Sequence, residues 1–221
     1  MIASLTGQGN NVRHACRFLG VTESGYYAWR SRPTSPRALR RIFLAGEIVD
    51  VHRASAGIYG ALRITAELRF GRQIVVGHNA VASIMNELAR EIETITRRLA
   101  PQLLEQPGVG PHAAAQLVLS WSHRGRIGSE AAFARLAGAA PIPASSGQTV
   151  RYRLDRSGDR KLNRALHMIL VTRKRSHPAT ITYIERRLQE GKTRREANRC
   201  LKRYLARSLY RLLEHGAPLA T

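Results

Sequence analysis

The sequence predicts a mainly α-helical protein: a helix-turn-helix unit followed by a helical domain that contains a helix-hairpin-helix and at most a small β element. Apolar residues recur three and four positions apart along most of the chain, as they do in amphipathic helices. Glycines and prolines separate these segments. A strand-like alternation occurs at residues 148–154. We therefore expect a helix-turn-helix-like segment over residues 1–90 and a second domain over residues 91–221, with a junction near residues 89–98.

The charge is strongly positive and unevenly distributed. The 221 residues include 36 Lys and Arg against 15 Asp and Glu, which gives a formal net charge of +21. Residues 1–90 contribute +7, residues 91–150 contribute +1 and residues 151–221 contribute +13. This excess favours a polyanionic partner, and nucleic acid is the leading one because each neutralised phosphate releases counterions. The alternatives are a solvated basic face or a binder of acidic membranes.

The cysteines and the apolar segments indicate where such a chain resides. Cys16 and Cys200 lie far apart and in no Cys/His cluster, so we expect neither a disulfide framework nor a zinc site. The N-terminus has no basic segment followed by an apolar run, and the apolar run at residues 166–171 is far shorter than the ~20 residues that cross a bilayer. We expect a reduced, soluble, cytoplasmic protein with no membrane partner and no visible cofactor or metal site.

Residues 15–30 predict a helix, a tight turn and a second helix. Cys16 is small enough for the inner face, and Gly20 can adopt the left-handed conformation of the turn, beneath which Val21 packs. Thr22 can cap the second helix. In a helix-turn-helix this second helix enters the major groove, and the alternative is a helical hairpin with Tyr27 and Trp29 in its core. The side chains available to DNA would be those of Ser24, Tyr26, Tyr27 and Arg30.

The rest of the first segment predicts a linker and further helices. Residues 30–40 contain two prolines among polar residues and are expected to be a linker. Leu44, Ile48 and Val51 then recur at helical spacing, and two more helices are expected over residues 61–68 and 78–88.

This first segment resembles the start of the second open reading frame product of transposases of the insertion-sequence three family. The resemblance is carried by "SGYYAWRSRP", "IVDVHRASAGIYGALRITAELR" and "VASIMNELA" and covers about residues 12–88. It implies a helix-turn-helix-like region that precedes an integrase-type catalytic domain. The acidic triad of that domain does not follow in this chain, so two-metal chemistry has no visible ligands here.

The stretch "PGVGP" at residues 107–111 predicts a helix-hairpin-helix. Gly108 and Gly110 allow a sharp turn and a close approach of the backbone to another molecule, and Pro111 suits the first turn of the next helix. Exposed amides at that helix start can hold a DNA phosphate without reading sequence. The alternative is an ordinary helical turn.

The chain beyond residue 128 predicts more helices and one extended arm. A helix capped by Ser129 ends at Gly138, an irregular connection follows, and residues 148–154 read as a short strand or arm with two arginines on one side. A helix begins near residue 160, and two more cover residues 179–188 and 194–213. The cations expected to follow a nucleic-acid backbone are Arg151, Arg153, Arg156, Arg160, Lys161 and Arg164, with a further basic surface on the last two helices.

This second half resembles the C-terminal domain of transposases of insertion-sequence family one hundred and ten, which are related to pilin-gene invertases. The motifs are "QPGVGPHAAAQLVL", "FARLAGAAPIPASSGQTVRYRLDRSGDRKLNRALHMI" and "TRREANRCLKRYLARSLYRLL", which cover about residues 100–213. The resemblance implies that Ser146 is the nucleophile that attacks DNA, and that Gly158 and Leu162 begin the following helix. Asp159 stands where the family usually has asparagine. The family's N-terminal domain, with four acidic metal-binding residues, has no counterpart, so the chain resembles a join of two transposase fragments.

Three functions follow as expectations. A serine hydroxyl is a weak nucleophile at neutral pH, so Ser146 needs a base or a metal, and Mg²⁺ would act only with a metal-binding domain supplied in trans. His123, His167 and His177 are possible bases. We expect a transposase-family DNA-binding protein that is incomplete as an enzyme. The alternatives are a non-enzymatic regulator or inhibitor of transposition and a protein that binds structured RNA. A second copy of the chain or a full-length transposase are further candidate partners.

Overall fold

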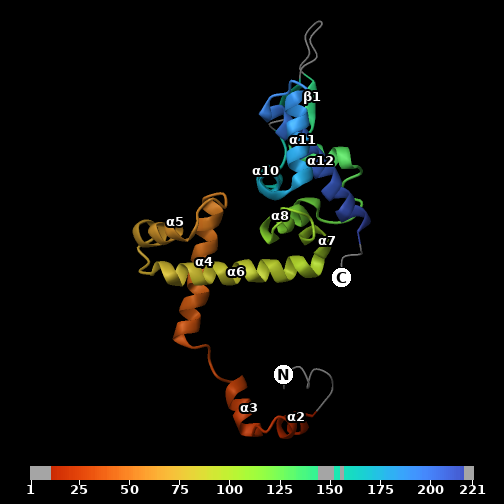
Figure 1. The fold of residues 1–221 in the computed structure, drawn as a ribbon. Coiled ribbons are helices and arrows are strands. Elements are labelled where there is room, and N and C mark those ends of the chain that lie inside the picture. The colour runs from red at the N-terminus through yellow and green to blue at the C-terminus, as the bar shows by residue number, and fades with distance from the viewer. Residues whose placement is uncertain (1–10, 144–151, 155–156, 217–221) are drawn as a thin grey trace. The chain divides into compact units, whose positions relative to one another are not determined.

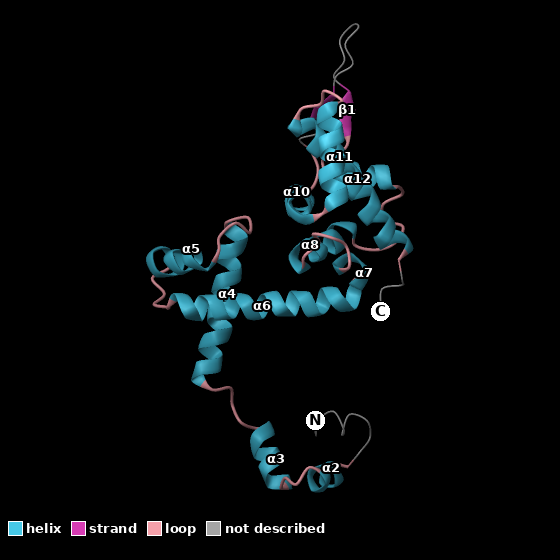
Figure 2. Ribbon diagram, viewed as in Figure 1, coloured by secondary structure: helices cyan, strands magenta, loops and turns pink. Residues whose placement is uncertain are grey.

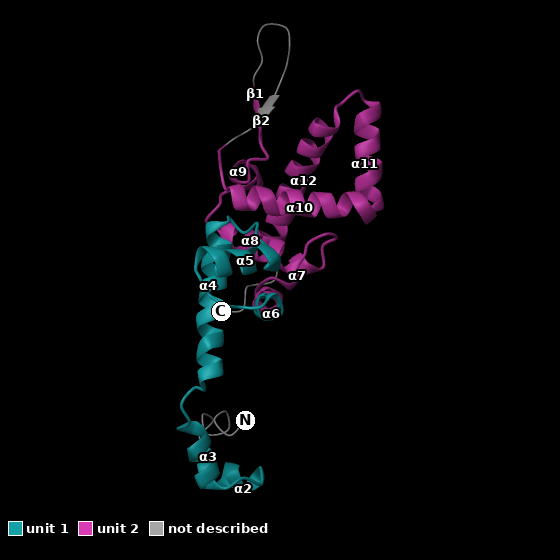
Figure 3. Ribbon diagram, turned by 90° about the vertical axis from the view of Figure 1, so that its left-hand side faces the viewer, with its two compact units in different colours: residues 1–85 teal, residues 86–221 magenta. Residues whose placement is uncertain are grey.

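The computed structural model describes residues 11–143, 152–154 and 157–216, with only the backbone of residues 152–154 (Figure 1). The mainly helical class that the sequence predicts is confirmed, as the colouring by secondary structure in Figure 2 makes plain. The chain divides into two compact units, residues 1–85 and 86–221 (Figure 3). Each unit is described below by itself.

Unit 1 begins with the expected helix-turn-helix. Helix α2 (Val12–Phe18) is followed by Gly20, whose φ of +66° makes the turn, and by α3 (Glu23–Arg30). Thr22 caps α3 by accepting a hydrogen bond from the amide of Gly25 at 3.1 Å, and Cys16 is buried as expected. The prediction that Val21 packs beneath the corner is wrong: its side chain is 46% exposed, because the turn is closed by the backbone bond from the Val21 amide to the Cys16 carbonyl.

The remaining helices of unit 1 are longer than the sequence predicts. Helix α4 (Pro36–Ala54) starts inside the expected linker, because Ser35 caps it and Pro36 occupies its first turn, where proline needs no hydrogen-bond partner. Helix α5 (Ala61–Ala66) continues into a π-helical turn, η1 (Glu67–Gly71). Their shared core contains Leu44, Ile48, Val51, Ile64 and Leu68.

Helix α6 (His78–Leu99) runs without a break through residues 89–98, where the sequence analysis expected a junction. The two units meet between Met85 and Asn86, inside this helix. A linker needs residues that interrupt helical hydrogen bonding, and this stretch has no proline or glycine. The position of the domain boundary stays a prediction.

Unit 2 is a helical domain with one contiguous core. Leu162, Leu166, Ile169 and Leu170 of its central helix are almost completely buried, as their spacing predicts, and they pack with Trp121 and Phe133 among others. The helices are α7 (Pro101–Leu104), α8 (Pro111–Trp121), α9 (Glu130–Leu136), α10 (Arg160–Ser176), α11 (Pro178–Gln189) and α12 (Arg194–His215).

A two-stranded antiparallel ribbon is the β element of unit 2. Strand β1 (Pro141–Pro143) pairs with β2 (Tyr152–Leu154), and Ile142 lies opposite Arg153. The strand at residues 152–154 was expected, whereas residues 141–143 were predicted to be irregular. Two prolines hide this partner strand from sequence patterns, because proline lacks an N–H and only Ile142 can donate to the ladder.

Within the part of the chain that the structure describes, no helix has both the length and the apolar character needed to span a membrane.

Candidate nucleic-acid interface

The start of helix α10 is held rigidly against the end of α9. Gly158 has φ of +96°, and a Cβ there would lie 2.3 Å from the carbonyl oxygen of Leu136, so glycine is required on both counts. The next amide, of Asp159, donates to the same carbonyl at 2.7 Å. The sequence-derived match of Gly158 to a helix start thus has a local physical reason.

Asp159, which stands where the family usually has asparagine, is the N-cap of α10. One carboxylate oxygen accepts from the amides of Lys161 and Leu162 at 2.8 and 3.0 Å, and the other accepts from Ser120 Oγ at 2.5 Å. Burial opposes the charged form, but these hydrogen bonds outweigh it and lower the pKa of Asp159. Asp159 is therefore a charged anchor that joins α8 to α10.

The serine segment begins and ends at the β ribbon. Pro143 and Tyr152 lie opposite each other in the ladder, so the chain leaves and returns to the ribbon at one place. Ser146, Arg151 and Arg156 lie outside the described residues, and the side chain of Arg153 is likewise not described. Their expected roles stay predictions.

Three predicted DNA-binding cations lie on the first two turns of α10, beyond the Asp159 cap. Arg160, Lys161 and Arg164 are exposed, whereas Leu162 between them is buried. Between these cations, Asn163 accepts a hydrogen bond from Lys202 Nζ of α12 at 2.9 Å. Burial lowers the pKa of this lysine. The start of α10 therefore presents positive charge to solvent while its other face is bonded to the core.

The hairpin glycines have different surroundings. Gly108 has φ of +75°, and a Cβ there would meet the carbonyl oxygen of Ile169 at 3.1 Å. Arg173 Nε, from the same helix α10, donates to the Pro107 carbonyl at 2.6 Å. Gly108 thus fits an internal contact with α10, and its expected close approach to DNA stays a prediction. Gly110 is exposed, caps α8 without a side-chain hydrogen bond and has open space around it.

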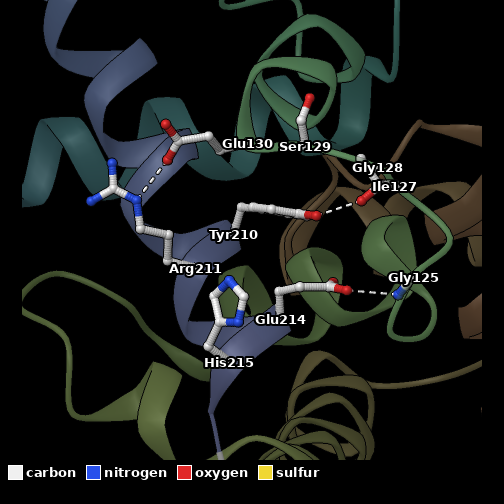
Figure 4. A pocket seen from close by; sticks show the side chains of 9 residues that line it. All are labelled: Gly125, Ile127, Gly128, Ser129, Glu130, Tyr210, Arg211, Glu214 and His215. Atoms are coloured by element: carbon white, nitrogen blue, oxygen red, sulfur yellow. Dashed lines mark hydrogen bonds and ion pairs between the residues drawn. The ribbon is translucent and has the colours of Figure 1, made fainter.

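Helix α12 binds the α8–α9 connection through its acidic and aromatic side chains (Figure 4). Glu214 accepts from Trp121 Nε1 at 2.8 Å and from the amide of Gly125 at 2.6 Å, and Tyr210 donates to the Ile127 carbonyl. Burial alone would raise the pKa of Glu214, but these hydrogen bonds keep it below its ordinary value. A hollow of about 550 Å³ opens beside these contacts. Its lining is Gly125, Ile127, Gly128, Ser129, Glu130, Tyr210, Arg211, Glu214 and His215.

Glu130 neutralises two arginines of α12. Its carboxylate accepts from Arg207 and, at 2.6 Å, from Arg211 Nε. The hydrogen bond from Arg211, with that from Arg207, lowers the pKa of Glu130 to about 2. No local sequence pattern indicates this cluster, because Glu130 lies 77 and 81 positions before the two arginines that it binds. Its acidic groups serve the fold, so the hollow is not a constellation of free carboxylates.

The three candidate bases have ordinary structural partners or basic neighbours. His177 Nδ1 lies 2.9 Å from Thr180 Oγ1, and His123 Nδ1 lies 3.2 Å from Ser122 Oγ. Burial, followed by the charges of Lys202 and Lys174, lowers the pKa of His167. The described residues contain no group of three or more His, Cys, Asp or Glu side chains that could hold a metal ion.

In unit 1 the predicted recognition helix presents only part of its expected DNA face. Ser24 and Arg30 are exposed, and Tyr27 is 50% exposed. These three residues follow one another at intervals of three and so lie along one side of α3. Tyr26 is only 5% exposed and packs beside Tyr27 and Trp29, so its ring belongs to the core of the helix pair rather than to a DNA-binding face.

Comparison with known families identifies two regions of the chain. Residues 100–185 match the family described as "Transposase IS116/IS110/IS902 family", and residues 39–89 match "HTH-like domain". The second match covers α4, α5 and most of α6, and it lies beyond α2 and α3.

Two insertion-element proteins are similar in sequence. "Insertion element IS110 uncharacterized 43.6 kDa protein" of Streptomyces coelicolor is 33% identical over 119 residues, which cover 53% of this chain and 29% of that protein. "Insertion element IS900 uncharacterized 42 kDa protein" of Mycobacterium paratuberculosis is 27% identical over 235 residues, which cover 94% of this chain and 59% of that protein. The chain therefore spans less than two thirds of either relative.

Three interpretations stay predictions: the resemblance of about residues 12–88 to the insertion-sequence three family, the link to pilin-gene invertases and the hybrid origin of the chain. One relative aligns across both units, whereas the two family matches are separate. The chain carries a transposase region of the IS116/IS110/IS902 type, preceded by a helix-turn-helix-like region.

Proposed function

We propose that this protein binds DNA as a transposase-type protein and that unit 2 supplies most of its phosphate-binding surface. The observation that carries the proposal is the excess of positive charge on α10–α12, of which α10 and most of α11 lie within the region that matches the transposase family. Residues 151–221 carry 19 basic and 6 acidic side chains. Four of those acids already have hydrogen-bond or ion-pair partners: Asp159 with Ser120, Glu190 with Arg187, Glu196 with Thr193, and Glu214 with Trp121.

Ser146 is the proposed nucleophile of a strand-transfer reaction that this chain cannot complete unaided. Its Oγ would lose its proton to a base and attack a phosphodiester, forming a new P–O bond while the P–O bond to the leaving sugar oxygen breaks and that oxygen takes up a proton. The guanidiniums of Arg151, Arg153 and Arg156 would stabilise the charge on the phosphoryl oxygens. In this proposal a base or Mg²⁺ is supplied by a partner domain in trans.

A covalent adduct test addresses this proposal. Purified protein is incubated with nicked or branched DNA and Mg²⁺, alone and with a full-length transposase, and adducts are resolved on a denaturing gel. We expect an adduct with the full-length partner that is lost in Ser146→Ala and kept in Ser145→Ala, which serves as the control. An adduct that survives Ser146→Ala, or no Ser146-dependent adduct in either arm, contradicts the role of Ser146.

A second candidate is a regulator that binds duplex DNA through α3. The exposed row formed by Ser24, Tyr27 and Arg30 favours it. Tyr27→Ala and Arg30→Ala should then abolish preference for a specific duplex selected from random sequence, while Ser31→Ala should not. Sequence preference that persists in both variants contradicts the regulator. Deletion of residues 151–221 is not a usable test, because it removes α10 and α12 from the core of unit 2.

A further inference from the structure

Helix α12 carries an arginine at every fourth position. The five residues are four apart, and a rise of 1.5 Å per residue places successive side chains about 6 Å apart along one slowly turning row. We name this row the arginine ridge. It consists of Arg195, Arg199, Arg203, Arg207 and Arg211.

The two halves of the arginine ridge differ in charge compensation. Arg207 and Arg211 bind Glu130, so the C-terminal half is neutralised. Arg195 and Arg203 are exposed, and neither has a hydrogen-bond or ion-pair partner among the described residues. In the N-terminal half, Arg195 and Arg203 therefore offer their guanidiniums to an external anion, whereas Arg199 is half-buried and its charge acts on Glu196.

An exposed aromatic ring points about 100° around α12 from Arg203, the last member of this uncompensated half. Tyr204 follows Arg203 directly and is 52% exposed. Its ring contacts that of Tyr183 on α11 edge to face, with centroids 5.9 Å apart and planes at 79°. An edge-to-face pair covers at most one face of each ring, so Tyr204 keeps a face open to solvent.

The neighbour of Tyr204 is held firmly in place. Arg186 and Arg187 lie 5.4 and 5.3 Å from the centroid of the Tyr183 ring, and Arg187 Nε donates to the Tyr183 hydroxyl at 3.1 Å. Tyr204 thus rests on a ring that is fixed by two cations. These two guanidiniums are paired with Glu190, so the free cations nearest in sequence to Tyr204 are those of the ridge. An exposed aromatic ring on a helix that carries free guanidiniums suits a ligand with flat apolar bases and an anionic backbone.

We infer that Tyr204 and the uncompensated half of the arginine ridge bind single-stranded DNA, with an unpaired base stacked on Tyr204 and the backbone phosphates on the arginines. Bases in a duplex present their faces only to one another, so a ring on an exposed helix can stack only with unpaired bases. The surrounding positive charge disfavours an apolar protein partner. This inference rests on the proposed DNA binding and adds the class of DNA that this surface takes.

The test compares single-stranded and duplex probes by fluorescence anisotropy on the full chain. A labelled oligothymidylate of about 15 nucleotides, close to the length that one stacking groove covers, is measured beside a duplex of equal length. Tyr204→Ala should weaken binding of the single strand by about 5-fold to about 150-fold, the range for loss of one stacked base, and leave duplex binding within about twofold. Tyr204→Phe should keep the affinity of the wild-type protein.

The controls separate this inference from the proposed function. Met168→Ala removes a side chain of equal exposure, 52%, from α10 and should change neither affinity. The inference is overturned if a folded Tyr204→Ala variant binds both DNA probes as the wild-type protein does, or loses affinity for both equally. It is also overturned if the variant loses affinity only for an oligouridylate RNA probe. Failure of the wild-type chain to bind either DNA probe overturns the proposed function itself.

Discussion

Gly108 shows how sequence can identify a residue as special without identifying the residue it packs against. Its sequence context suggested an approach to a phosphate, whereas its positive φ and its contact with the Ile169 carbonyl show that it packs against α10. The sequence could identify the glycine because glycine is preferred wherever φ is positive. It could not identify the partner, because Ile169 lies far along the chain.

The two hairpin glycines give a matched stability prediction. Gly108→Ala should lower the free energy of unfolding by about 1–2 kcal/mol or more, because alanine disfavours positive φ and its Cβ would crowd α10. Gly110→Ala should have a much smaller effect, because φ is −89° and the space around it is open. Urea unfolding followed by circular dichroism measures both. Equal losses would contradict the internal role of Gly108.

At the scale of elements, helices with a strong apolar row could be predicted and their ends often could not. The inward residues of α10 and the Ser129 cap of α9 follow from spacing and capping chemistry. The start of α4 and the length of α6 do not, because Pro36 is compatible with both a linker and a helix start. The difference in charge compensation between the two halves of α12 also could not be predicted from the sequence, because Glu130 meets Arg207 and Arg211 only in the folded structure.

The Glu130 cluster predicts opposite effects on stability and on DNA binding. Glu130→Gln should lower the melting temperature, since two ion pairs are lost, and should tighten binding to duplex DNA, since Arg207 and Arg211 become available to phosphate. Glu185→Gln on α11 is the control for charge alone. Anisotropy that shows equal tightening in both variants would contradict a specific release of the ridge.

The same cluster predicts a pH dependence. The pKa of Glu130 falls from 4.5 to about 2 on folding, so its stabilisation is fully present above about pH 4.5 and is lost as the pH falls towards 2. The melting temperature of the wild-type protein should therefore decrease more steeply over this window than that of Glu130→Gln. Parallel decreases, followed by circular dichroism, would show that Glu130 does not contribute.

At the scale of the whole molecule, the charge distribution could be predicted from the sequence, whereas the location of the proposed DNA-binding surface could be predicted only in part. The positive excess after residue 150 follows directly from counting, and it lies on helices whose apolar faces fill the core of unit 2. The placement of Tyr204 beside Tyr183 depends on how α11 packs against α12, which no local pattern specifies. Sequence therefore indicated the type of partner and the structure located a surface for it.

The salt dependence of DNA binding tests the central claim most directly. The association constant of the full chain for duplex DNA should fall as salt rises, with a logarithmic slope of about −0.9 for each phosphate neutralised. Replacing Arg195, Arg199 and Arg203 together by alanine should make this slope shallower by about 0.9 for each arginine that contacts a phosphate. The charge-matched control replaces Arg37, Arg63 and Arg69 of unit 1 and should change the slope less. A slope near zero, or an equal change in both triple variants, would contradict the account.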